Sequence, residues 1–229
     1  MNQGGTIVFD IIGTCFSLNQ PRQQLMELGA PAHAMQLWFA QSLRDSFALS
    51  HAGHYQPLKK ILEAELPRSL AALGIQAEDE QLAQVVQTFS QLELQAGAET
   101  AFRTLVNAGW RLVALTNGSE ESTHKLLEQV GVLSYFDRIF SCDAVQKTKP
   151  HPDVYALVKQ NDPGEMWMVA AHAWDIMGAV SAGLRTVFIS QEEAAYLAVY
   201  PQPEIVAIDL IDAANRIVSL AQESLQSEC

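Results

Sequence analysis

Asp10 is the first residue of the sequence whose type and position could do chemistry. It follows the apolar run Thr6 to Phe9, which is typical of a strand buried on both faces of a parallel sheet. Gly13 and Thr14 come directly afterwards and indicate the loop that leaves the carboxyl end of that strand. Because ligands bind at this end in open α/β sheets, Asp10 is a candidate for chemistry. An aspartate after a strand can also simply cap a turn.

Thr116 and Asn117 follow a second apolar run, Leu112 to Leu115. A helical pattern begins at Ser119, and the backbone N–H groups at the start of a helix favour an anion. An ordinary turn with Ser119 as the helix cap explains Gly118 and Ser119, but it does not require Thr116. The two residues before the turn are therefore candidates for binding a substrate.

A lysine and a second aspartate stand at comparable places later in the chain. Lys149 precedes Pro150, and proline holds the residue before it in an extended conformation that would aim an ammonium group rigidly. A lone lysine in a loop is otherwise usually solvated. Asp175 follows the predicted strand 166–171 and could cap a helix or act as a second catalytic carboxylate. His172, at the end of that strand, could act as a base near neutral pH or simply form a hydrogen bond.

The elements between these residues alternate from residue 97 onward. The predicted strands are 111–115, 138–141, 166–171, 185–189 and 205–208, and the predicted helices are 99–108, 119–130, 152–160, 174–182 and 209–225. Strands separated by helices of about ten to fifteen residues indicate βαβ units. The sequence therefore predicts an α/β fold with a mainly parallel sheet.

The segment between the first strand and this alternating part carries only helical patterns. Apolar residues recur at helical spacing in 21–30, 32–50, 56–73 and 78–94. An insertion here predicts a cap domain over the carboxyl end of the first strand, or else a plain helical subdomain. The predicted domains are a core of 1–14 and 96–229 and a helical cap of 15–95.

Composition limits the partners. The chain has 229 residues, is 48% hydrophobic and carries a formal net charge of −12, and it has no Lys/Arg run that would bind nucleic acid. An anionic substrate would need a local positive site. Cys15, Cys142 and Cys229 form no complete disulfide set and have no metal-type spacing, which fits a reducing cytosol. No apolar run approaches the length of a membrane span, and we expect a cytoplasmic protein.

Four phrases stand in a defined order along the chain: Phe9 to Thr14, Leu115 to Ser119, Lys149-Pro150 with Tyr155, and Ala170 to Gly178. In this order the sequence resembles the haloacid dehalogenase-like superfamily, and within it the type II (S)-2-haloacid dehalogenases. The resemblance extends over essentially the whole chain. It implies a Rossmann-like, doubly wound parallel sheet with an inserted helical cap, a small anionic substrate and a homodimer.

Ile12 distinguishes between the reactions of this superfamily. Its phosphatases have a second aspartate two residues after the nucleophile, because an alkoxide leaving group needs a general acid. Here that place is taken by Ile12, which cannot donate a proton, whereas a halide leaves without protonation. Ala170 and Ala171 stand where the phosphatases have the Gly-Asp of their magnesium site, which leaves Asp175 alone. We therefore expect no required metal and no cofactor.

The resemblance implies a role for each candidate residue. Asp10 would attack the carbon bearing the halogen and form an ester, and Asp175 would activate or position the water that hydrolyses it. Lys149 would keep Asp10 ionised and oriented. The candidates for binding the substrate or the oxyanion, or for supporting the site, are Thr14, Thr116, Asn117, Ile12, Phe39, Tyr155, His172 and Trp174.

Two departures from the family's pattern concern charge and hydrogen bonding. Family dehalogenases have an arginine directly after a Leu-Trp pair of the cap, but Phe39 follows Leu37-Trp38 here. Arg44 lies about 140° round a helix from Phe39 and is a poor substitute. His172 stands where family members often have asparagine, and Ala170 where they often have serine.

Three functions remain open on these residues. The leading hypothesis is a metal-independent hydrolase that forms an ester on Asp10 and acts on a small 2-haloacid. A magnesium-dependent phosphatase is the first alternative, against which Ile12 and Ala171 argue. The second is a binding or regulatory protein that kept the fold and lost turnover, as Phe39 and Ala170 suggest.

Overall fold

The computed structural model describes residues 5–160, 164–191, 193 and 195–227. The strands are β1 (Thr6–Phe9), β2 (Arg111–Thr116), β3 (Phe136–Ser141), β4 (Met166–Ala170), β5 (Arg185–Ile189) and β6 (Ile205–Ala207). The α-helices are α1 (Asn19–Glu27), α2 (Ala34–His51), α3 (Leu58–Ala72), α4 (Asp79–Gln87), α5 (Ala98–Asn107), α6 (Glu120–Gln129), α7 (Pro152–Lys159), α8 (Ala173–Ser181) and α9 (Leu210–Ser227). Short 3₁₀ helices are η1 (Thr88–Ser90), η2 (Leu133–Tyr135) and η3 (Cys142–Ala144).

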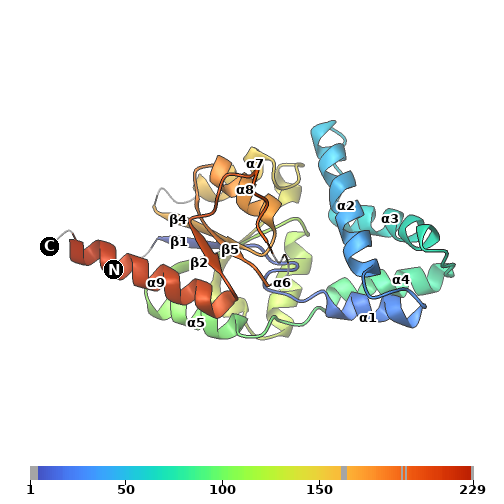
Figure 1. The fold of residues 1–229 in the computed structure, drawn as a ribbon, viewed down its shortest axis with the longest axis horizontal. Helices are drawn as coiled ribbons and strands as arrows, with labels where there is room; N and C mark the ends of the chain where they lie inside the picture. Colours follow the sequence, from blue (N-terminus) through green and yellow to red (C-terminus); the bar gives the residue numbers. More distant parts are fainter. Residues whose placement is uncertain (1–4, 161–163, 192, 194, 228–229) are drawn as a thin grey trace.

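The six strands form one sheet in the order β3-β2-β1-β4-β5-β6, and every pair in it is parallel. Helices α5 and α9 lie on one face of this sheet, and α7 and α8 lie on the other (Figure 1). This arrangement confirms the predicted doubly wound α/β fold. Because β1 pairs with both β2 and β4, the loops that follow these three strands are neighbours in space.

Both faces of the sheet are buried, which explains the apolar run before Asp10. Along β1, successive side chains point to opposite faces. Ile7 and Phe9 join the apolar cluster under α5, α6 and α9, while Val8 joins the cluster under α7 and α8. Fully burying side chains of this size contributes about 1.5–3 kcal/mol each. Burial on both faces therefore favours apolar residues at successive positions of this central strand.

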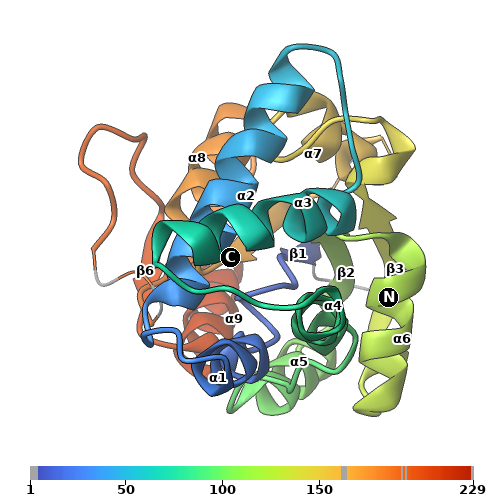
Figure 2. The ribbon, with the colours of Figure 1, turned by 90° about the vertical axis from the view of Figure 1, so that its right-hand side faces the viewer.

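Helices α1 to α4 are inserted between β1 and β2 and form a separate layer beyond one end of the sheet (Figures 1 and 2). They enclose an apolar cluster of their own, in which Trp38 and Leu66 are fully buried. None of the helices in the described ranges has both the length and the apolar character needed to cross a bilayer.

The chain leaves and re-enters the sheet domain along two paired segments. Ser17 N–H donates to the carbonyl of Glu93 at 2.8 Å, and Gln95 N–H donates to the carbonyl of Cys15 at 2.8 Å. The prediction of a helix over 78–94 is therefore wrong at its end, since α4 stops at Gln87 and η1 at Ser90. The backbone groups of 93–95 pair with the outgoing segment instead of with a helical turn.

Candidate active site

Three charged side chains from different parts of the chain meet in the interior. The ammonium nitrogen of Lys149 lies 2.8 Å from Oδ1 of Asp10 and 2.6 Å from Oδ2 of Asp175. All three residues are buried, and Lys149 and Asp175 are completely inaccessible. Asp10 follows β1 and Asp175 lies in the first turn of α8 after β4, so the pairing of these two strands brings them together. The structure thus unites the three charged residues that the sequence singled out.

Lys149 is held by more than its two carboxylates. Its ammonium also donates to the carbonyl oxygen of Leu115 at 2.9 Å, and its backbone N–H donates to Oδ1 of Asn117 at 3.0 Å. An ammonium group has three hydrogens, and three protein acceptors receive them. Lys149 is therefore a fixed positive charge of the protein, and substrate would find its hydrogens already engaged.

The pKa values of the cluster follow from these contacts. Burial by itself would raise the pKa of Asp10, but the charge of Lys149 and hydrogen bonds from Lys149 and Thr14 hold it below its ordinary value. Burial and the charge of Asp10 raise the pKa of Asp175 in spite of Lys149. Burial would lower the pKa of Lys149, yet the two carboxylates raise it. Asp10 is thus the carboxylate that the site keeps ionised.

Thr14 orients the second oxygen of Asp10. Its hydroxyl donates to Oδ2 of Asp10 at 2.7 Å and accepts the N–H of Ala171 at 2.9 Å. Gly13 makes this tight loop possible, because its φ is +85° and a Cβ there would lie 2.6 Å from Nε2 of His172. The sequence motif Gly13-Thr14 therefore serves the geometry of Asp10 directly.

Tyr155 lies behind Asp175. Its hydroxyl donates to Oδ1 of Asp175 at 2.6 Å and lies 3.1 Å from the carbonyl of the same residue. Tyr155 was a candidate for binding substrate, but it is fully buried and its contacts make it a support for Asp175. Gly178 gives the hydroxyl its space, since a Cβ at Gly178 would collide with it and would lie 2.6 Å from Pro150.

His172 connects Asp10 to a residue that the sequence did not indicate. Its Nε2 lies 3.2 Å from the carbonyl oxygen of Ile12 and 3.9 Å from Oδ2 of Asp10, and its Nδ1 lies 3.5 Å from Glu193. Burial would lower the pKa of His172, but contact with Glu193 and the charge of Asp10 raise it above its ordinary value. Because both ring nitrogens face acceptors, the protonated ring fits this place.

Thr116 and Asn117 line the site from the end of β2. The hydroxyl of Thr116 accepts the N–H of Gly118 at 3.0 Å and keeps its own hydrogen to donate. Oδ1 of Asn117 accepts from the thiol of Cys142 at 2.8 Å as well as from Lys149. These two contacts fix the amide so that its NH₂ group supplies the remaining donors.

A cavity encloses these groups. Its lining consists of Asp10, Ile12, Phe39, Leu43, Leu58, Thr116, Asn117, His172 and Trp174. The cavity is only about 10 Å³, about the space that one water molecule needs. Seven of these lining residues were predicted to bind substrate or to be catalytic, all except Leu43 of α2 and Leu58 of α3. Leu43 and Leu58 were not predicted, although Leu43 belongs to the apolar stripe of α2.

Asp175, Lys149, Tyr155 and Thr14 do not stand among the residues that line this cavity in the described part of the chain. Lys149 and Thr14 instead contact Asp10, which lines the cavity. Asp175 contacts Lys149, and Tyr155 contacts Asp175. The geometry therefore separates a lining, which can touch a ligand, from a set of charges and hydroxyls that hold Asp10.

Helix α2 also contacts the segment that carries Lys149. The hydroxyls of Ser46 and Thr148 lie 2.8 Å apart, and the backbone N–H of Thr148 donates to Ser50 at 3.0 Å. These polar residues are buried. Sequence periodicity could not identify them, since serines on a helix are ordinarily exposed. They connect the helical layer to the residue beside Lys149.

Comparison with known proteins identifies the family of this chain. A family model for haloacid dehalogenase-like hydrolases matches residues 5–183, which include Asp10, Thr116, Lys149 and Asp175. The chain belongs to this family. An (S)-2-haloacid dehalogenase of Pseudomonas putida is 27% identical over 93% of this chain and 96% of its own length.

Solved structures of the same class share the fold of this haloacid dehalogenase-like hydrolase. The L-2-haloacid dehalogenase of Xanthobacter autotrophicus has a TM-score of 0.83 with 23% identity, covering 93% of this chain and 97% of that protein. A second structure of that enzyme, with chloropropionic acid covalently bound, has a TM-score of 0.82 with 24% identity over the same shares. The α/β fold described above is therefore also the fold of these solved structures.

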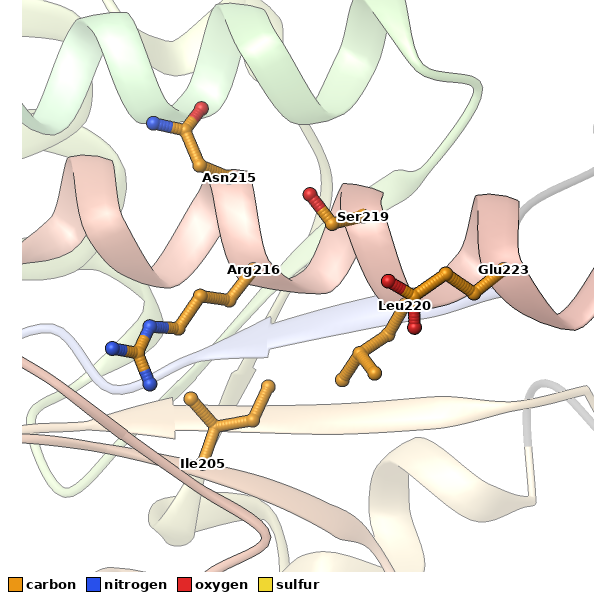
Figure 3. Close-up of a pocket in the computed structure, with 6 residues that line it drawn as sticks. All are labelled: Ile205, Asn215, Arg216, Ser219, Leu220 and Glu223. Atoms are coloured by element: carbon orange, nitrogen blue, oxygen red, sulfur yellow. The ribbon is translucent and has the colours of Figure 1, made fainter.

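A second pocket lies away from Asp10. This pocket of about 340 Å³ lies between β6 and α9 and includes Arg216 and Glu223 (Figure 3). Arg216 is paired with Asp212 at 3.0 Å, and no residue of the cavity around Asp10 lines this pocket. Within the described ranges, no three metal-ligating side chains come together in a way that would hold an ion.

Proposed function

We propose that this protein hydrolyses a small 2-haloacid to the corresponding 2-hydroxy acid through an ester on Asp10. The observation that carries the proposal is the pairing of Asp10, buried and held ionised by Lys149, with Ile12 beside it in the cavity. Such a site presents a carboxylate nucleophile and offers no acid at the position two residues later. It suits a leaving group that departs without a proton.

In the first step, a carboxylate oxygen of Asp10 attacks the carbon that bears the halogen. A carbon–oxygen bond forms while the carbon–halogen bond breaks, and the halide leaves with its electron pair. Thr116 and Asn117 hold the substrate carboxylate through the donors described above. Lys149 and Thr14 keep both oxygens of Asp10 in place for the attack.

In the second step, water attacks the carboxyl carbon of Asp10. Negative charge then develops on the Asp10 oxygen that is not bonded to the substrate. This oxygen faces Lys149 if it is Oδ1, at 2.8 Å in the resting site, or Thr14 if it is Oδ2, at 2.7 Å. The bond from this carbon to the ester oxygen breaks, and that oxygen leaves with the product and takes one proton of the attacking water. The other proton passes to solvent, so that Asp10 is restored as a carboxylate. Asp175 acts in this scheme by positioning Lys149, because its own oxygens are engaged by Lys149 and Tyr155.

His172 supplies positive charge at the lining of the cavity. Phe39, which lies 6.1 Å from the ring of His172 between centroids, is neutral. The raised pKa of His172 and its two acceptors favour the protonated ring over a general base. In this proposal, His172 attracts the anionic substrate and the departing halide.

An isotope experiment tests the ester directly. With enzyme in excess over substrate in ¹⁸O-enriched water, the first hydroxy acid released should contain ordinary oxygen, because that atom comes from Asp10. The label should appear in Asp10 instead and reach the product only over later turnovers. Label in the product of the first turnover would show direct attack by water and overturn the proposal.

Asp10→Asn should lower halide release by at least about 10³-fold, because the amide is a poor nucleophile. Intact mass should show the substrate adduct on wild-type protein and none on Asp10→Asn. The same mass measurement verifies that the variant has kept its amide. Undiminished halide release from a verified variant would contradict the role of Asp10.

The two alternatives give different results in the same assays. Halide release that persists in EDTA supports the dehalogenase, whereas phosphate release that requires Mg²⁺ would identify a phosphatase. A binding or regulatory protein that has lost turnover would release neither halide nor phosphate.

A further inference from the structure

A larger cavity of about 590 Å³ adjoins the catalytic one; we call it the outer chamber. The two cavities share four lining residues, Phe39, Leu43, His172 and Trp174. The outer chamber extends from this shared wall along α2, where Met35 and Ala40 line it. It is therefore the space directly behind the side chains that face Asp10.

The wall between the two cavities is made of rings in contact. The rings of His172 and Trp174 are stacked with centroids 5.5 Å apart, and Phe47 of the outer chamber packs on Trp174 at 5.2 Å. Apart from His172, these side chains are largely apolar. A hydrocarbon group that passed between Phe39 and Leu43 would break no side-chain hydrogen bond, because these two side chains have none.

The polar residues of the outer chamber carry mainly positive charge. Arg22 is half-buried and donates to the amide oxygen of Asn19 at 2.5 Å. Arg44 is exposed and pairs with Asp45 at 2.8 Å. Glu193, the acidic lining residue, is engaged with His172. An anion with an apolar body fits this combination better than a cation does.

We propose that the outer chamber binds the apolar tail of a longer 2-haloacid, whose reacting carbon lies at Asp10. This inference rests on the proposed dehalogenase function and specifies its substrate class. The catalytic cavity has about the space of one water, which is too little for an alkyl chain, so the tail of a longer substrate has to lie beyond the shared wall. The outer chamber has the size of ordinary small-ligand pockets, about 300–1,000 Å³.

The test is a series of 2-bromo acids from propionate to decanoate, with halide release as the assay. The value of kcat/KM should rise about fourfold for each added methylene, the equivalent of about 0.8 kcal/mol of apolar burial, until the chamber is filled. The gain should come from KM with little change in kcat, because the tail is bound equally in the ground and transition states. An equal kcat/KM along the series would overturn the inference.

Ala40→Phe fills the outer chamber without touching the catalytic cavity, because Ala40 lines only the former. It should abolish the gain for the long substrates and leave 2-bromopropionate unchanged. Ala48→Phe is the matched control on the same helix, since Ala48 is exposed and lines neither cavity. An equal loss on short and long substrates in Ala40→Phe, or an equal effect in Ala48→Phe, would contradict the proposal.

A binding measurement separates this inference from the proposed function. Calorimetry with hexanoate, octanoate and decanoate requires no turnover. Affinity that rises with chain length and is lost in Ala40→Phe supports the outer chamber even if no 2-bromo acid is hydrolysed. Absence of chain-length dependence in wild-type protein overturns the inference even if 2-bromopropionate is a substrate.

Discussion

Lys149 shows how single side chains divide the work of the site. Its ammonium group donates to Asp10, Asp175 and Leu115, so its hydrogens are used within the protein. Removing one partner of a buried ion pair ordinarily costs about 3–5 kcal/mol, because an uncompensated charge remains. One lysine thus offsets the repulsion between the two buried carboxylates. A positive charge that contacts the substrate has to come from another residue.

His172 makes stability depend on pH. Its pKa in the folded protein is raised above the ordinary value of about 6.5, so its contribution to stability is complete below about pH 6.5 and is lost as pH rises through the raised pKa. The free energy of unfolding of the wild-type protein should therefore exceed that of the His172→Gln variant by more at pH 6 than at pH 9. Urea unfolding measures both, with His124→Gln on the exposed surface of α6 as the control.

The same titration should govern activity. If protonated His172 attracts the substrate, kcat/KM falls as pH rises through the pKa of His172, and His172→Gln lacks this descending limb. A limb that ascends over this range and is absent from His172→Gln would identify a general base instead.

At the scale of elements, α8 positions the catalytic charges through a close contact. Its first turn carries Asp175, and Gly178, one turn later, leaves space for Tyr155 and Pro150. Pro150 in turn follows Lys149. Tyr155 and Pro150 can therefore pack against α8 only because residue 178 is a glycine.

Gly178→Ala should destabilise the protein by about 1–3 kcal/mol through overpacking, although alanine is the better helix former by about 1 kcal/mol. Activity should fall as well, since Tyr155 can no longer hold Asp175. Urea unfolding and halide release measure the two effects. Tyr155→Phe in the Gly178→Ala variant removes the colliding hydroxyl and should recover part of the lost stability. If the effects of the two substitutions simply added, the double variant would recover none.

The sequence predicted those parts of the site that follow from strand order. Asp10 follows β1, Thr116 is the last residue of β2, and His172 comes soon after β4. Parallel pairing of these strands brings the three residues together. Glu193 and Leu58 could not be predicted in this way, because their places depend on how a loop and the helical layer pack. For the same reason, the predicted helix 78–94 extended too far into the segment that pairs with Cys15.

At the scale of the whole molecule, the negative charge of the protein opposes the binding of an anionic substrate. The formal net charge is −12, and a negative field of this kind opposes an anionic substrate. Within the described residues, Arg22 and Arg44 line the outer chamber and His172 lies between the two cavities. Arg22 and Arg44 thus place positive charge at the outer chamber, and His172 places it at the wall shared with the cavity around Asp10. Sequence composition alone predicted that such a site was needed, and the fold brings it together from α1, α2 and the loop after β4.

The small size of the catalytic cavity also ties turnover to the viscosity of the solvent. A cavity with the space of one water has to open whenever substrate enters or product leaves, and the helices α1 to α4 then move through solvent. Doubling the relative viscosity with glycerol should lower kcat by up to about twofold when this motion limits turnover. Ester formation from prebound substrate should change little, as rapid quenching and intact mass would show. An unchanged kcat would show that chemistry is slower than the motion. A kcat that falls with viscosity would show that solvent friction on these helices, and not the bond changes at Asp10, sets the rate of turnover.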